Sequence, residues 1–156
     1  MTADLHTIAV RMHNYYRRLV ATGWAKDKKI GYAPTAKNML ELKYVDCTPA
    51  DTLAAETKTK VTGCPSTAPQ ASTGHSLNYY YVNRYDIPRE QLLHEAITKW
   101  ANQVAEIGVG KDNIFDPNGG VTNYANMVHD QVTKIACAVE VCTRSGNSAV
   151  ACQYNA

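Results

Sequence analysis

The stretch at residues 121–142, VTNYANMVHDQVTKIACAVEVC, is dense in side chains that could do chemistry. Its candidates are two amides, an imidazole, a carboxylate and two thiols: Asn123, Asn126, His129, Asp130, Cys137 and Cys142. An imidazole beside a carboxylate can hold a metal ion or transfer a proton, and a thiol becomes a nucleophile when a base lowers its pKa. The same residues could instead form the shell of a site that has lost its working groups. The choice depends on the remainder of the chain.

The cysteines favour disulfide bonds over thiol chemistry. There are five of them: Cys47, Cys64, Cys137, Cys142 and Cys152. None form the paired Cys-x-x-Cys spacing of a structural zinc site, and three fall within the last twenty residues, in a stretch that is typical of two strands. This pattern is typical of a secreted, extracellular protein. The odd number leaves one cysteine over, which is either a free thiol or has lost a partner in a removed segment.

Composition describes an ordinary globular chain, which we expect to be one domain over residues 1–156. Net charge is +2, and residues 26–29, KDKK, form the one tight basic cluster, which is too little for a nucleic-acid-binding stripe. No apolar run approaches the roughly 20 residues that span a bilayer, so we expect no membrane insertion. The start, MTADLHTIAV, lacks the regions of a signal peptide, and we expect that a leader has been removed before it.

Three segments have helical periodicity and three are typical of strands. Residues 3–22, 48–63 and 89–107 are the predicted helices, the second with Thr48 as N-cap and Pro49 at its first position. LNYYYV at residues 77–82 favours a strand, and residues 135–142 and 149–154 predict a hairpin. Helices mixed with a hairpin predict an α+β domain.

The order of these segments resembles the CAP superfamily, and within it the secreted activation-associated proteins of parasitic nematodes. The matching stretches are MHNYYRRLVATGWAKD at 12–27, APTAKNMLELKYVDC at 33–47, KWANQVAEIGVG at 99–110, NYANMVHDQVTKIACAVEVC at 123–142, and VACQY at 150–154. The resemblance implies a three-layer α-β-α sandwich. It also implies the disulfides Cys137–Cys152 and Cys64–Cys142, with Cys47 left alone.

Members of this family usually carry two histidines and two glutamates around a central cleft, where they can hold a divalent cation. The positions that match this tetrad hold other residues here: Ala68, His75, Gln103 and Asn123. Amides are poor zinc ligands and cannot act as bases at neutral pH. We therefore expect no metal, no cofactor and no catalytic residue, and residues 121–142 are interpreted as the shell of a lost site.

A rebuilt metal site is the alternative at this position. His75 and His129 could bind a cation if Asp130 faced the same way. We consider it the weaker interpretation, because a histidine without a demonstrated partner is more often an ordinary surface or core side chain.

The resemblance implies binding rather than catalysis. Relatives of this kind in blood-feeding nematodes include secreted proteins that bind host integrins and block leukocyte adhesion or platelet aggregation, so we expect a host cell-surface protein as partner. The sequence has neither RGD nor KGD. Exposed carboxylates beside lysines on loops are the remaining candidates: Lys111 with Asp112, and Lys26 with Asp27. Carriage of a lipid or sterol is a second hypothesis, and a hydrolase is a third that the altered tetrad disfavours.

Overall fold

The computed structural model describes residues 2–45 and 48–156, and its mixture of helices and strands confirms the α+β class. In chain order the elements are α1 (Ala3–Ala21), β1 (Lys26–Asp27), β2 (Gly31–Tyr32), β3 (Lys43–Tyr44), α2 (Leu53–Val61), β4 (Ser76–Val82), α3 (Arg89–Ala101), α4 (Gln103–Glu106), α5 (Thr122–Val128), β5 (Lys134–Cys142) and β6 (Asn147–Tyr154). The short elements β1, β2, β3 and α5 had no clear signal in the sequence.

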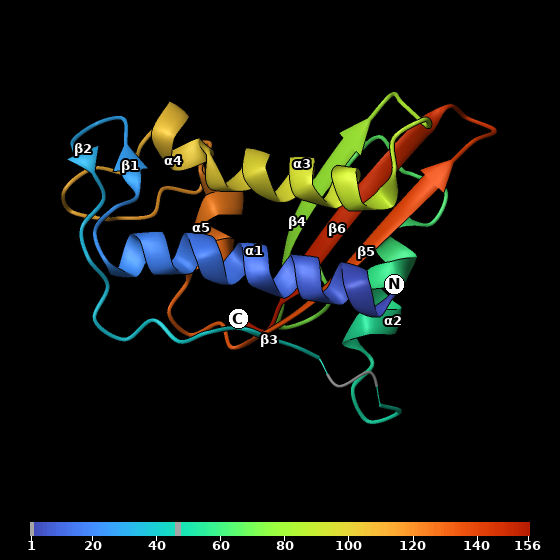
Figure 1. Cartoon of the computed structure of the whole chain (residues 1–156), viewed down its shortest axis with the longest axis horizontal. Coiled ribbons are helices and arrows are strands. Elements are labelled where there is room, and N and C mark those ends of the chain that lie inside the picture. Colours follow the sequence, from blue (N-terminus) through green and yellow to red (C-terminus); the bar gives the residue numbers. More distant parts are fainter. Residues whose placement is uncertain (1, 46–47) are drawn as a thin grey trace.

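The main sheet has the strand order β3-β5-β6-β4. Strands β5 and β6 pair antiparallel from Ile135 opposite Tyr154 to Cys142 opposite Asn147, which confirms the predicted hairpin. Strand β4 pairs antiparallel with the other edge of β6, whereas β3 lies parallel to β5. A separate two-stranded sheet joins β1 to β2. This small hairpin lies at the end of the molecule opposite α2 (Figure 1).

Helices cover both faces of the main sheet, and the side chains of β5 show why. Ile135, Cys137 and Val139 belong to the large core that includes α1 and α3. The alternate residues Ala136 and Ala138 face the other way, against the apolar side of α2. Because successive side chains of a strand point to opposite faces, one strand supplies both cores. The result is the three-layer α-β-α sandwich that the resemblance implied, with α1 and α3 side by side over one face (Figure 1).

Helix α1 follows its predicted bounds closely. The Thr2 side chain accepts the backbone N–H of Leu5 at 3.3 Å and so caps the first turn. The buried positions repeat along one stripe: Leu5, Ala9, His13, Arg17 and Val20. The helix ends at Ala21, and Gly23 follows with a φ of +81°, which only glycine adopts without strain. Two polar residues, His13 and Arg17, therefore lie inside the core.

The other two predicted helices need correction. The predicted helix 48–63 begins at Leu53, so Thr48 is not its N-cap. Residues 48–51 form a turn in which the Asp51 N–H donates to the Thr48 carbonyl, and the Asp51 carboxylate accepts the N–H of Leu53 at 3.2 Å. An Asx turn of this kind starts the helix later, at its first buried side chain. The predicted helix 89–107 divides at Asn102 into α3 and α4.

Two disulfides form with the pairing that the resemblance implied. Cys64 bonds Cys142 with a separation of 78 residues, and Cys137 bonds Cys152 directly across the β5–β6 hairpin. Cys47 lies outside the described residues. Within the part of the chain that the structure describes, no helix is both long enough and apolar enough to cross a bilayer.

Candidate functional site

Two of the four tetrad positions meet at the start of α5, and their groups are engaged in the fold. The Gln103 side-chain oxygen accepts the backbone N–H of Tyr124 at 3.0 Å. The backbone carbonyl of Asn123 accepts the Asn78 side-chain amide at 2.8 Å. Asn126 in turn donates to the Asn78 oxygen at 2.9 Å. These contacts hold α5 against α4 and β4, and the groups that make them are amides and backbone atoms.

A buried histidine lies next to this amide cluster. His13 Nδ1 is 2.7 Å from the Ala9 carbonyl, which can only accept, so Nδ1 carries the proton. Nε2 is then the acceptor for the Tyr154 hydroxyl, also at 2.7 Å. Burial lowers the pKa of His13 to about 4 and raises that of Tyr154 well above its ordinary value. Neither group changes protonation near neutral pH, so the pair supports the fold and supplies no acid or base.

The other two tetrad positions lie on the loop before β4. Ala68 is exposed and carries no ligating group. His75 is half-buried, and its Nδ1 lies 2.9 Å from the Thr73 carbonyl. Of the four positions, only His75 has a side chain of the type that zinc prefers. The divalent cation that the family implies therefore does not fit the residues present here.

The rebuilt site of His75, His129 and Asp130 is not assembled. His129 and Asp130 lie together, with 3.6 Å between Nδ1 and Oδ1, and both side chains are about half exposed. The same Nδ1 accepts the backbone N–H of Gln131 at 3.1 Å. The His75 ring is engaged elsewhere, with Thr73. Among residues 2–45 and 48–156, no three His, Cys, Asp or Glu side chains gather closely enough to hold a metal ion.

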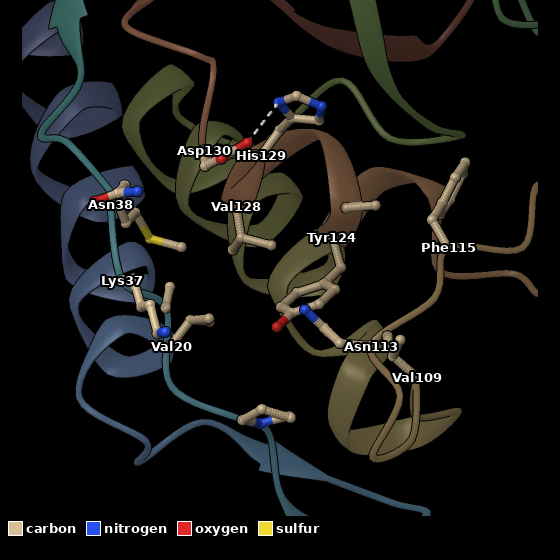
Figure 2. A pocket seen from close by; sticks show the side chains of 14 residues that line it. Val20, Lys37, Asn38, Val109, Asn113, Phe115, Tyr124, Val128, His129 and Asp130 are labelled. Atoms are coloured by element: carbon tan, nitrogen blue, oxygen red, sulfur yellow. Dashed lines mark ion pairs between the residues drawn. The ribbon is translucent and has the colours of Figure 1, made fainter.

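His129 and Asp130 instead form part of the rim of a surface hollow of about 440 Å³. Figure 2 shows it between α1, the segment at 34–39, α5 and the loop at 109–115. Val20, Val128 and the Tyr124 ring give it an apolar base. Burial raises the pKa of Tyr124 to about 12, so its hydroxyl stays protonated. The hollow thus combines an apolar base with a polar rim that includes Lys37 and Asn38.

Arg17 fixes one wall of this hollow by holding the chain beyond α5. Its guanidinium donates to the carbonyls of Met127 at 3.0 Å and His129 at 2.8 Å, and to that of Val132 at 3.3 Å. Its Nε donates to the Leu40 carbonyl at 2.9 Å. Burial lowers the pKa of Arg17 to about 10, which still leaves it charged at neutral pH. Arg17 and His13 were not among the predicted site residues, although their four-residue spacing from Leu5 and Ala9 places them on the buried stripe.

The two predicted loop carboxylates differ in their surroundings. Asp112 and its neighbour Lys111 are exposed, on a loop where Gly110 and Asn113 both have positive φ. Asp27 is only 2% exposed, so the prediction that it offers a free carboxylate is wrong. Its Oδ1 accepts the N–H of Lys29, and its Oδ2 accepts those of Val109 and Gly110. Lys26 beside it remains exposed.

Comparison with known proteins places this geometry in context. The family model for CAP, the cysteine-rich secretory protein family, matches residues 10–154. The Ancylostoma secreted protein of Ancylostoma caninum is 30% identical over 145 residues, which are 92% of this chain and 32% of that protein. Hookworm platelet inhibitor 1 of the same species is 28% identical over 151 residues, 97% of this chain and 63% of that protein. The chain spans less than two thirds of the length of both curated relatives.

Solved structures agree with the family match. The crystal structure of NaASP2 with Zn²⁺ has a TM-score of 0.89 at 28% identity, covering 99% of this chain and 80% of that one. The crystal structure of hookworm platelet inhibitor has a TM-score of 0.63 at 27% identity, covering 99% of this chain and 70% of that one. The chain thus shares its sandwich fold with these proteins.

Proposed function

The chain belongs to the cysteine-rich secretory protein family, and on that premise we propose that it is a secreted, single-domain binding protein without enzymatic activity. Its partner in this proposal is a host adhesion receptor of the integrin class, whose blockade would inhibit platelet or leukocyte adhesion. The similarity to hookworm platelet inhibitor 1 supports a host protein as the partner.

One observation carries the non-enzymatic part of the proposal. Two tetrad positions hold Gln103 at the start of α4 and Asn123 at the start of α5. The Gln103 side-chain oxygen and the Asn123 backbone carbonyl already accept hydrogen bonds within the fold. Neither residue can transfer a proton or ligate zinc strongly. The nearby His13 is neutral and bonded at both ring nitrogens. No water-activating group remains at these positions, which favours recognition through the surface.

The chemistry of an exposed loop supports an integrin as the receptor in this proposal. Integrins commonly bind a ligand carboxylate through a divalent cation, with a basic side chain close by. Asp112 with Lys111 offers this pair on a projecting loop, and the positive φ values of Gly110 and Asn113 fix the turn around it. Asp27 is excluded from this role by its burial. Asp112 is therefore the carboxylate that the proposal selects.

The experiment is inhibition of platelet aggregation, with binding to purified integrins measured in parallel. Asp112→Ala should lose most of the inhibition while keeping the thermal stability of the parent. Asp86→Ala is the matched control, because Asp86 is also exposed and lies 3.9 Å from a basic side chain, that of Arg84. Full inhibition by Asp112→Ala, or an equal loss with Asp86→Ala, would remove the loop carboxylate from the proposal.

Lipid carriage is the second candidate, and the hollow in Figure 2 favours it specifically. Its apolar base of Val20, Tyr124 and Val128 under a rim with Lys37 could hold an acyl chain with its polar end outward. Mass spectrometry of an organic extract of the purified protein tests this directly. A bound lipid that disappears in Val128→Asp, together with unchanged integrin binding, would separate the two functions.

A further inference from the structure

The β1–β2 hairpin at residues 24–32 has an inner and an outer side of different character. Ala25 and Asp27 are buried on the inner side. The outer side exposes 67% of Trp24, 51% of Tyr32 and 41% of Ile30. The Trp24 and Tyr32 rings meet edge to face with centroids 6.1 Å apart. Large apolar side chains exposed together in this way mark an interaction surface.

The charge of this hairpin is positive on its outer side. Lys26, Lys28 and Lys29 are all exposed, and the one acid among them, Asp27, is turned inward. The adjoining segment at 106–112 adds one lysine and two acids, so these two segments together expose four lysines and two carboxylates. The hairpin itself therefore offers lysines and aromatic rings without a compensating acid.

Asp27 also makes the hairpin rigid. Burial alone would raise the pKa of Asp27, but the N–H donors of Gly110, Val109 and Lys29 outweigh burial and lower it. The N–H of Lys28 donates to the Val104 carbonyl at 3.1 Å, which ties the turn to α4. Gly108 allows this approach, because a Cβ there would lie 2.7 Å from the Asp27 carboxylate. The surface is thus preformed and loses little conformational entropy on docking.

We propose that this hairpin docks on the surface of an anionic phospholipid bilayer. Trp24, Tyr32 and Ile30 would enter the interfacial layer, where tryptophan and tyrosine are preferred, and the lysines would lie beside the headgroups. This contact is peripheral and goes beyond the proposed function, since it needs no receptor.

The choice of a bilayer over a protein partner depends on the kind of basic residue. Protein interfaces are enriched in arginine and depleted in lysine, whereas polybasic segments at membrane surfaces attract anionic lipid through charge alone. All positive charge on residues 24–32 comes from lysine. Tyr15, which is 55% exposed and lines a shallow hollow with Trp24 and Lys26, extends the aromatic surface beside the hairpin.

The two tryptophans allow a direct measurement. Trp100 is 1% exposed in the core, whereas Trp24 is exposed on the hairpin, so a change in emission on docking reports Trp24. Vesicles of equal parts phosphatidylcholine and phosphatidylserine should shift the emission to the blue, and vesicles of phosphatidylcholine alone should not. Vesicle sedimentation gives the partition coefficient independently. High salt should weaken the binding, because it screens the lysines.

Variants test both components. The double variant Lys28→Gln/Lys29→Gln should lower the partition coefficient onto anionic vesicles about 25-fold. Each lysine is expected to contribute about 5-fold. The control is Lys58→Gln with Lys60→Gln on α2, at the opposite end of the molecule, which changes net charge equally. Trp24→Ala should also weaken partitioning, whereas Tyr85→Ala, at a side chain that is 56% exposed, should not. Circular dichroism melting confirms that each variant is folded.

Three results would overturn the proposal. The first is equal partitioning onto neutral and anionic vesicles. The second is the same loss of binding in the Lys58/Lys60 control as in the Lys28/Lys29 variant. The third is a Trp24 emission shift that needs cell membranes and disappears when they are treated with protease, since the hairpin would then bind a protein.

Discussion

Asp27 in the end hairpin and His13 in the core are both buried polar side chains, but one is charged and the other neutral. Asp27 faces backbone N–H groups of Lys29, Val109 and Gly110, which favour the carboxylate and lower its pKa. His13 faces the Ala9 carbonyl and a hydroxyl, and burial lowers its pKa to about 4, so it stays neutral. At Asp27 several backbone N–H groups together outweigh burial, whereas at His13 the single Ala9 carbonyl favours the charged form and burial outweighs it.

Asp27 and His13 also differ in what they support: Asp27 supports an exposed hairpin and His13 supports the core. The buried Asp27 carboxylate holds the β1–β2 hairpin against Val109 and Gly110, and the outer side of that hairpin is exposed. The neutral His13 cluster, with Tyr154 and Asn78, is satisfied internally and lies beside the Asn123 carbonyl at the start of α5. The two proposals above place recognition outside this core, on the loops at residues 24–32 and 109–115.

The largest effect should come from the other buried charge, Arg17. It is 2% exposed and donates to the carbonyls of Leu40, Met127, His129 and Val132. Arg17→Gln removes most of these donors, and we expect it to lower the free energy of unfolding by about 3–5 kcal/mol. Arg18→Gln, at an exposed neighbour, should change it by less than about 0.5 kcal/mol. Urea unfolding measures both, and equal effects would mean that Arg17 does not join these segments.

The next largest effect should be a loss of stability at low pH, caused by protonation of His13. Its pKa is about 4 when folded and about 6.5 when unfolded, so the unfolded state binds the proton first as pH falls. Stability is complete above about pH 6.5 and should decrease by about 3 kcal/mol toward pH 4. Unfolding curves across this range measure the slope. His13→Gln should flatten it and His6→Gln should largely retain it; a slope that survives His13→Gln would assign the titration to another group.

Asp27→Asn should have a somewhat smaller effect, of about 2 kcal/mol on unfolding, because three charge-assisted hydrogen bonds to the backbone are weakened. Asp112→Asn, on the loop that the Asp27 bonds hold, should be nearly neutral because its side chain is exposed. Thermal melts at neutral pH compare the two. If Asp27→Asn is as mild as Asp112→Asn, the hairpin is held by its apolar contacts instead.

Sequence patterns found the large elements and missed most of the polar architecture. Strong periodicity located α1, the β5–β6 hairpin and most of α3, because burial of a regular face determines these elements. The start of α2 was misplaced because Thr48 and Pro49 imitate an N-cap, while the Asx turn at Asp51 provides the start that forms. Two-residue strands such as β3 are too short to show an alternation of apolar and polar residues, so the sequence does not reveal them.

Residue types at the candidate site can be read from the sequence, whereas the contacts of those residues cannot. The altered residue types at Ala68, Gln103 and Asn123 are readable from the sequence through the resemblance. The burial of Asp27 was not, because its partners at Val109 and Gly110 are more than eighty residues away. A charged residue in a lysine-rich loop is usually exposed, and only the long-range contacts show otherwise.

The smallest expected effect is the response to zinc. If the core cluster is structural, zinc should produce no stoichiometric heat at micromolar concentrations in isothermal titration. The reason is the residue set: Ala68 has no ligating group, and the Gln103 oxygen already accepts the Tyr124 N–H. His75 is the sole imidazole among the four positions, and one neutral ligand holds zinc weakly.

A variant with Ala68→His, His75→Glu, Gln103→Glu and Asn123→His provides the comparison with the family's residue types. Stoichiometric heat in the unaltered protein that vanished in His129→Ala would show instead that His129, with Asp130, has become part of a new metal site. The core would then still be chemically active, and the contrast with the hairpin would fail.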